Sequence, residues 1–261
     1  MSDAIEAVRA DRAALLEISR GLTPAQWQAP SGCPGWSVQD VVAHLAAGFW
    51  AMVDLSQLPD ITGQPFEHGA EVWVQSRRGL RPRDVLADYE QVSSTGLDRL
   101  AGFAGLDMQV PLADAGTYPA ALVPAAYGFD HYTHIRADLF APRGPLDAEP
   151  PPSDELRTGA ALDWIEAALP QQNTAAEARA TLELDVTGPG GRVITFGSGP
   201  AKATVTSDGP AFVRWVTQRA SWPDVGAQAA GDEAALLGHV RGRIGDGLRV
   251  RAEVLQVLMH P

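Results

Sequence analysis

The sequence is poor in cysteine and almost free of lysine. Cys33 is its single cysteine, which excludes an internal disulfide, and Lys202 is the only lysine among 20 basic residues. With 32 acidic residues the net charge is −12, so the broad basic surface that binds nucleic acid is lacking. The same negative charge disfavours binding to an anionic membrane surface. We therefore expect neither nucleic acid nor membrane among the partners of this protein.

Long hydrophobic runs are also lacking. No run approaches the ~20 apolar residues that a membrane-spanning helix needs. Residues 1–21 are charged and amphipathic, unlike a secretory signal peptide. Together with the lack of a disulfide, this predicts a cytoplasmic protein. Of the 261 residues, 45% are hydrophobic and 20% charged, which excludes general disorder and suffices for a large core or two domains.

The first 140 residues follow helical spacing. Apolar residues recur there every three to four positions. A first helix follows a cap at Ser2 or Asp3 and stops at Gly21, and Ser37 with Asp40 resembles a capping box before the second. The pattern predicts an up-and-down bundle of four long helices. The helical segments expected are 4–21, 38–55, 67–78, 82–103 and 119–140.

The second half reads differently. Residues 141–153 hold five prolines, which is typical of a linker. Beyond them, segments in which apolar and polar residues alternate predict strands, and the glycine-rich residues 188–191 predict a turn. The sequence therefore predicts an α+β protein of two domains, a helical bundle over 1–140 and a small α+β domain with a short sheet over 154–261. Strands are expected at 180–186, 192–196 and 202–206, and helices at 154–169, 211–219 and 232–240.

Three side chains of two predicted helices form a candidate metal site. His44 lies on the apolar part of the second helix, and neutral imidazole is the commonest metal ligand. Asp130 and His134 are four residues apart, so they share one helix face and can close on one ion. His131 lies on another face, and Asp138 is near enough to orient a ligating histidine. The alternatives are a buried histidine with a hydrogen-bond partner and a local Asp–His hydrogen bond.

The combination favours the metal site. One histidine from an early helix and a carboxylate–histidine pair from a late helix is a usual way to build a metal site inside a bundle. Three protein ligands with an open position are the pattern of catalytic zinc. Cys33, by contrast, has no basic neighbour in the sequence that lowers the pKa of a thiol, and we do not expect a catalytic cysteine.

Three segments carry a familiar pattern. Residues 22–45 contain Leu-Thr-x-x-Gln-Trp and then Cys-Pro-Gly-Trp-Ser-Val-x-Asp-Val-Val-Ala-His-Leu. This resembles the start of the mycothiol-dependent maleylpyruvate isomerase family. Gly-Pro-Gly-Gly-Arg at 188–192 and Phe-Val-x-x-Val-Thr-Gln-Arg at 212–219 resemble the C-terminal domain of the same family. The resemblance covers nearly the whole chain and implies a DinB-like four-helix bundle followed by a sterol-carrier-like α+β domain.

The resemblance also implies a ligand set. The family holds a divalent metal, usually zinc, with a histidine of the second helix and a Glu-x-x-x-His pair of the last helix. His44, Asp130 and His134 match these positions, with aspartate where the family has glutamate. Because aspartate is one methylene shorter, the ion would lie closer to the backbone or be held more loosely. A register one turn earlier would make His131 the ligand instead of His134.

Arginines of the family hold an anionic substrate or the thiol cofactor. By resemblance, Arg219 is a catalytic and cofactor-binding residue and Arg78 a further cofactor contact, with Arg77 as its alternative. We expect a metal-dependent transferase or cis-trans isomerase that uses mycothiol, a low-molecular-weight thiol, on a small anionic electrophile. The metal would activate the thiolate for addition. The protein would be a monomer or a homodimer.

Two other functions stay open at this point. The first is a non-catalytic protein that binds an apolar ligand and has a decayed metal site. The second is a thiol-independent metal hydrolase, in which water takes the open position.

Overall fold

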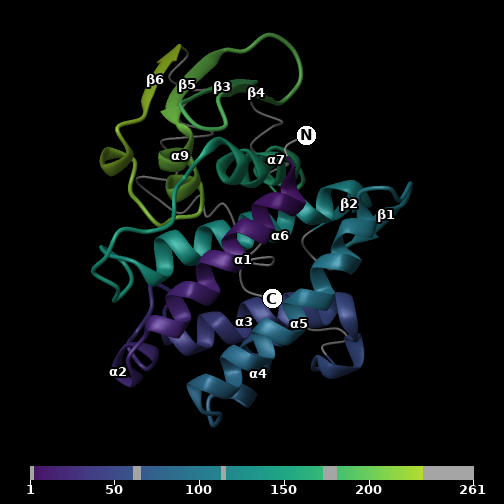
Figure 1. Ribbon diagram of the computed structural model, residues 1–261. Helices are drawn as coiled ribbons and strands as arrows, with labels where there is room; N and C mark the ends of the chain where they lie inside the picture. Colours follow the sequence, from purple (N-terminus) through teal and green to yellow (C-terminus); the bar gives the residue numbers. More distant parts are fainter. Residues whose placement is uncertain (1–2, 61–65, 113–115, 173–180, 232–261) are drawn as a thin grey trace.

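The computed structural model describes residues 3–60, 66–112, 116–172 and 181–231. Figure 1 shows a helical N-terminal region and a sheet in the C-terminal region, which confirms the expected α+β fold. The helix predicted over 232–240 lies outside the described residues. Within the described part of the chain, no helix combines the length and the hydropathy needed to cross a membrane.

Four helices pack into the bundle, and a fifth flanks it. α3 packs mainly against α5, α1 packs against α6 and α5, and α4 lies on the outer side of α3 (Figure 1). The bounds are α1 Ala4–Gly21, α3 Val38–Val53, α4 Phe66–Arg77, α5 Pro82–Phe103 and α6 Val123–Thr133. Large side chains fill the interior, among them Leu15, Leu45, Phe49, Tyr89 and Leu100.

The end of α3 and the segment that precedes this helix differ from the prediction. α3 ends at Val53 rather than at Leu55, because Asp54 has an extended backbone (φ −159°) and its carboxylate caps the short helix η1 (Leu55–Gln57). A short helix that the sequence analysis left unassigned, α2 (Pro24–Trp27), begins after Thr23, whose side chain forms a capping box with Gln26.

The segment predicted as one helix over 119–140 is divided. Its first residues belong to β2 (Thr117–Pro119), which pairs antiparallel with β1 (Gln109–Pro111), and to the single turn η3 (Ala120–Leu122). Pro124 lies in the first turn of α6, where the missing N–H costs nothing. After Thr133 the helix widens into the π-helical turn η4 (His134–Leu139). Such turns are rare in proteins, and those that occur are often found at functional sites.

The C-terminal sheet has the strand order β4-β3-β5-β6. The β3–β4 pair is an antiparallel hairpin across the predicted glycine turn, β3 and β5 are parallel, and β5 and β6 are antiparallel. The bounds are β3 Leu182–Thr187, β4 Arg192–Phe196, β5 Ala203–Asp208 and β6 Gln228–Gly231. The helix predicted over 211–219 is α9 (Gly209–Val216), which ends before Arg219 because Gln218 takes a positive φ of 59°.

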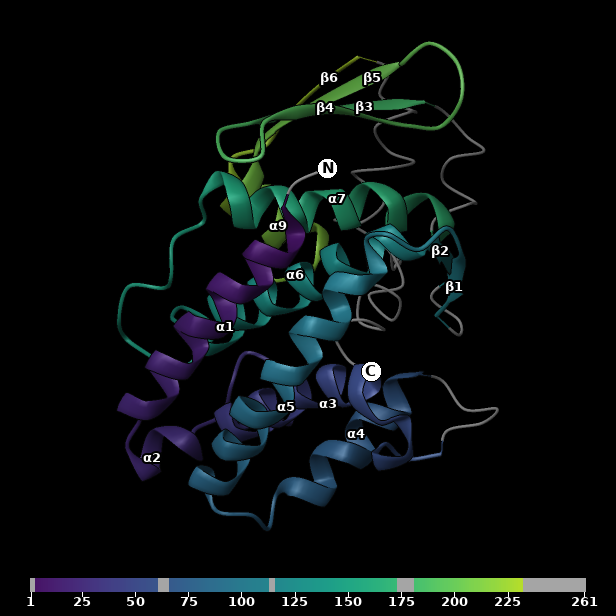
Figure 2. The same ribbon diagram turned by 45° about the vertical axis from the view of Figure 1, so that its right-hand side comes forward.

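α7 (Glu155–Gln172) lies between the sheet and the bundle, against α6 and α1 (Figure 2). Trp164 of α7 is fully buried in a second hydrophobic core that joins Phe129 of α6 to Leu184 and Val205 of the sheet. This second core therefore contains residues from both sides of the predicted linker 141–153. The division into 1–140, linker and 154–261 stays a prediction.

A buried charge cluster fastens three elements together. Asp11 of α1 is 1% exposed and accepts from Arg136 of η4 (Nη2–Oδ1, 2.8 Å) and from Arg157 of α7 (Nε–Oδ1, 2.9 Å). One carboxylate thus pairs with two arginines whose side chains are themselves mostly buried. Breaking such a pair from one side is costly, because it leaves an uncompensated buried charge.

Candidate metal centre

The start of α3 positions the first candidate ligand. Asp40 N donates to Ser37 Oγ (3.2 Å) and Ser37 N donates to Asp40 Oδ2 (2.9 Å), which is the predicted capping box. Seven residues after this cap, His44 is 1% exposed in the bundle core. The ring of Trp36 lies beside it, with centroids 5.3 Å apart.

The structure brings His44, Asp130 and His134 together. Asp130 Oδ1 lies 3.3 Å from His44 Nε2 and 3.4 Å from His134 Nε2. One ligand atom of each residue falls within 4.8 Å of the others, and all three residues are buried. Asp130 and His134 occupy one face at the junction of α6 and η4, as their spacing indicated.

Burial and charge decide the protonation of these groups. Burial lowers the pKa of His44, which favours the neutral imidazole that binds metals. Burial opposes ionisation of Asp130, but its interactions with His44, which include a hydrogen bond, and with His134 outweigh burial and hold its pKa below the ordinary value. Burial also opposes protonation of His134, yet Cys33 and Asp138 at Nδ1 keep its pKa well above the ordinary value.

This set of donor atoms fits a divalent metal. Two imidazole nitrogens and one carboxylate oxygen are the ligand types of zinc and of other first-row metals. Asp130 is 8% exposed, and the ion-pair partners found for it in the described part of the chain are the two histidines. A cation between the three side chains would compensate the charge of this carboxylate.

His131, the alternative ligand, points elsewhere. Its Nδ1 lies 3.0 Å from the carbonyl oxygen of Tyr127, and its Nε2 lies 3.1 Å from the hydroxyl of Tyr89. Since the carbonyl only accepts, Nδ1 donates to it and Nε2 accepts from the Tyr89 hydroxyl. Both ring nitrogens are thereby engaged away from His44.

The second ring nitrogen of His134, Nδ1, faces Asp138 and Cys33 instead of the three candidate ligands. Nδ1 lies 2.9 Å from Asp138 Oδ2 and 3.5 Å from Cys33 Sγ. Cys33, His134 and Asp138 form a second set of close potential ligands. Cys33 has no basic neighbour along the chain, but the fold brings His134, 101 residues away, to its side.

Arg219 contacts Asp138, the carboxylate that also contacts His134. Its Nε donates to Asp138 Oδ1 and Oδ2 (3.1 and 3.0 Å), and its Nη2 donates to Oδ2 (2.6 Å). Its Nη1 donates to the Thr217 carbonyl (3.2 Å), and the side chain is 6% exposed. Arg219 is thus part of the centre, but its contact is with Asp138.

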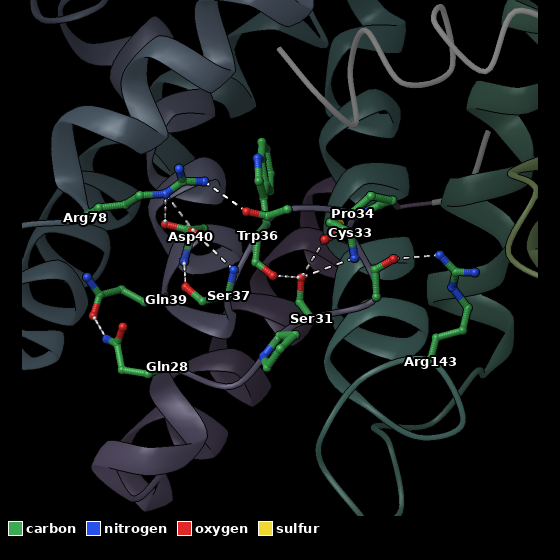
Figure 3. Close-up of a pocket in the computed structure, with 13 residues that line it drawn as sticks. Gln28, Ser31, Cys33, Pro34, Trp36, Ser37, Gln39, Asp40, Arg78 and Arg143 are labelled. Carbon is green, nitrogen blue, oxygen red and sulfur yellow. Dashed lines mark hydrogen bonds and ion pairs between the residues drawn. The ribbon is translucent and has the colours of Figure 1, made fainter.

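Arg78 lines an open cavity of about 760 Å³ around the loop 31–36. Its Nε donates to Asp40 Oδ2 (3.3 Å) and its Nη2 to the Gly35 carbonyl (3.0 Å). Figure 3 shows Arg78 and Arg143 on opposite sides of the loop, with Cys33 between them. Cys33 and Trp36 line this cavity and also contact the candidate ligands, Cys33 at His134 and Trp36 at His44.

A second cavity, of about 460 Å³, lies between η4 and α9. It is lined by Arg136, Arg143, Arg214 and Arg219, with Asp224 as the acidic residue of the lining. Arg143 lines both cavities, and its Nη2 donates to the Gly32 carbonyl (2.7 Å). The sequence analysis missed Arg143, which follows the bundle in the proline-rich segment and matches no motif.

Comparison with known proteins supports the resemblance. Residues 8–134 match the model of the mycothiol maleylpyruvate isomerase N-terminal domain. The crystal structure of the mycothiol-dependent maleylpyruvate isomerase matches with a TM-score of 0.59 at 17% identity, covering 88% of this chain and 93% of its own. A histidine-to-alanine mutant of that enzyme matches over the same shares, with a TM-score of 0.58 at 15% identity.

At these identities the structural likeness shows the fold alone. Among curated proteins there is no significant match. Because residues 8–134 match the model of the mycothiol maleylpyruvate isomerase N-terminal domain, the resemblance to that family is confirmed.

Proposed function

We propose that this protein is a metal-dependent enzyme that uses mycothiol as cosubstrate, as an isomerase or an S-transferase of a small anionic electrophile. The observation that carries the proposal is the buried cluster of His44, Asp130 and His134 inside the family's N-terminal domain. Zinc is the proposed metal, since two histidines and a carboxylate with an open position are typical of its catalytic sites.

A bound zinc ion would stabilise the thiolate of the cosubstrate near neutral pH. The side chains of the protein supply the rest. His44 and His134 are buried and face Asp130, so water is largely excluded from the three ligands. The ring of Trp36 is stacked with that of His134 and tilted against that of His44, and its Nε1 donates to Glu71 (2.7 Å), which fixes the indole beside the centre.

The two reactions differ in the fate of the sulfur. In an isomerase the thiol sulfur adds to a conjugated double bond, rotation follows about the resulting single bond, and loss of the sulfur restores the double bond. In a transferase the C–S bond forms as a leaving group departs, and it persists. Arg78, which is partly exposed in the 760 Å³ cavity, is proposed as a contact of the thiol cosubstrate. Arg219 lines the 460 Å³ cavity, but the contacts described for its donors are with Asp138 and Thr217, so we propose for it no direct contact with substrate.

An assay with zinc-loaded protein separates the alternatives. Maleylpyruvate, the substrate named for the structural relative, is the probe for isomerisation, and a fluorogenic alkylating agent is the probe for S-transfer. We expect turnover of one probe that requires both zinc and mycothiol and is lost in His44→Ala. Turnover without thiol would favour the metal hydrolase. Lack of zinc binding would contradict the proposal and favour the binding protein.

A further inference from the structure

Arg219 and His134 are connected through one buried carboxylate. Asp138 is fully buried and lies between them, with Oδ2 at 2.9 Å from His134 Nδ1 and at 2.6 Å from Arg219 Nη2. Arg219 follows α9 in the C-terminal region, whereas Asp138 and His134 belong to η4 of the N-terminal region. The contact therefore joins the two regions at the candidate metal centre.

The geometry decides which nitrogen of His134 faces the ligand cluster. Asp138 accepts the Nδ1 proton, so the imidazole is oriented with Nε2 toward Asp130 and His44. A metal-bound histidine usually donates its other ring N–H to a carboxylate, which fixes the tautomer and makes the ligand more basic. A fully buried carboxylate needs a second partner to keep its charge and position, and Arg219 supplies it as a two-pronged donor.

We propose that Arg219 is a positioning residue, which acts through Asp138 to hold His134 in the geometry that binds the metal. The C-terminal region thereby sets the metal affinity of a site whose ligands all lie in the N-terminal region. This inference rests on the proposed function for the presence of a metal, and it assigns Arg219 a different role from direct recognition of an anionic substrate.

The test measures zinc affinity by competition with a chromophoric chelator at fixed pH. The variants are Arg219→Gln, Arg219→Lys and Asp138→Asn, with circular dichroism to verify the fold. The matched control is Arg192→Gln, because Arg192 also forms an ion pair with an aspartate of the C-terminal region, Asp163, but does not touch the centre. We expect zinc to bind about 10- to 100-fold more weakly in Arg219→Gln and Asp138→Asn, as when outer-shell partners of other metal sites are removed.

The remaining variants and an NMR measurement on the parent test the same inference in other ways. Arg219→Lys keeps the charge but offers a single point of contact, so its affinity should fall between that of the parent and that of Arg219→Gln. Arg192→Gln should bind zinc within about twofold of the parent, since it shares no partner with the ligands. In the zinc-loaded parent, imidazole nitrogen NMR should show His134 protonated at Nδ1, a result that does not depend on how any variant folds.

Three outcomes would overturn the inference. If the parent binds zinc and Arg219→Gln binds it equally tightly, Arg219 has no positioning role and the proposed function stands. If His134 is protonated at Nε2 in the zinc-loaded parent, the orientation inferred here is wrong. If the parent binds no divalent metal, the proposed function fails together with this inference.

Discussion

Nδ1 of His134 lies 2.9 Å from Oδ2 of Asp138, four residues further along the chain. Asp130, four residues before His134, lies at the other ring nitrogen at 3.4 Å. One helical face therefore places a carboxylate on each side of one imidazole. This arrangement distinguishes the two carboxylates by role, since Asp130 faces the second histidine and Asp138 faces Arg219.

His131→Phe should leave the metal site intact and destabilise the fold. The substitution keeps a ring but leaves the Tyr89 hydroxyl without its partner in the core. We expect a loss of about 1–3 kcal/mol in the free energy of unfolding, the usual cost of a buried polar group without a hydrogen bond. Urea unfolding and the zinc content of the purified variant measure the two effects. Loss of zinc with an intact fold would make His131 a ligand.

Cys33→Ser should retain the metal. Cys33 contacts His134 at Nδ1, on the side away from Asp130, so its sulfur is not expected to coordinate the ion. The absorption spectrum of the cobalt-substituted parent should lack a thiolate-to-metal charge-transfer band, and Cys33→Ser should give the same spectrum. Such a band, lost in the variant, would instead place the ion between Cys33, His134 and Asp138.

Asp11→Ala should strongly destabilise the protein. The variant leaves the guanidinium groups of Arg136 and Arg157 without the carboxylate that pairs them. Removing one partner of a buried ion pair costs about 3–5 kcal/mol, which urea denaturation resolves. A matched surface control is Glu6→Ala, whose exposed pair with Arg9 should contribute less than about 1 kcal/mol. Equal effects of the two substitutions would contradict the role of Asp11.

Gly32→Ala should disturb the contact between the 31–36 loop and η4. A Cβ atom at Gly32 would meet Asp138 Oδ1 at 2.8 Å and Asp138 Cα at 2.9 Å, and Gly32 N donates to the Asp138 carbonyl. Such overpacking costs about 1–3 kcal/mol. Gly79→Ala is the control, since a Cβ there meets no atom within 4 Å. Thermal unfolding of both variants checks the expectation. Equal midpoint temperatures would show that the loop accommodates the added Cβ atom without loss of stability.

Local signals predicted much of the fold. The Ser37–Asp40 capping box placed the start of α3, and the glycine turn placed the β3–β4 hairpin. Other elements lack such signals. Pro111 and Pro119 argue against strands, yet β1 and β2 pair as a short ladder, and β6 contains no β-branched residue. The π-helical turn after Thr133 is not indicated by the spacing of apolar residues along the chain.

The site was predictable where it depends on spacing along one helix. The Asp130–His134 interval indicated a shared face, and His44 was indicated by its place on the apolar part of a helix and then by the family motif. Contacts between distant segments gave no such signal. Arg219 meets Asp138 across 81 residues, and Cys33 meets His134 across 101, so charge and spacing within each segment do not reveal these pairs.

The most direct test of the account is the zinc content and zinc affinity of the purified protein, measured by elemental mass spectrometry and chelator competition. His44→Ala and His134→Ala are compared with His68→Ala, in which an exposed histidine outside the centre is removed. We predict about one zinc ion per chain in the parent and in His68→Ala, and its loss in the other two variants. Zinc retained without His44 and His134, or no zinc in the parent after reconstitution, would contradict the account.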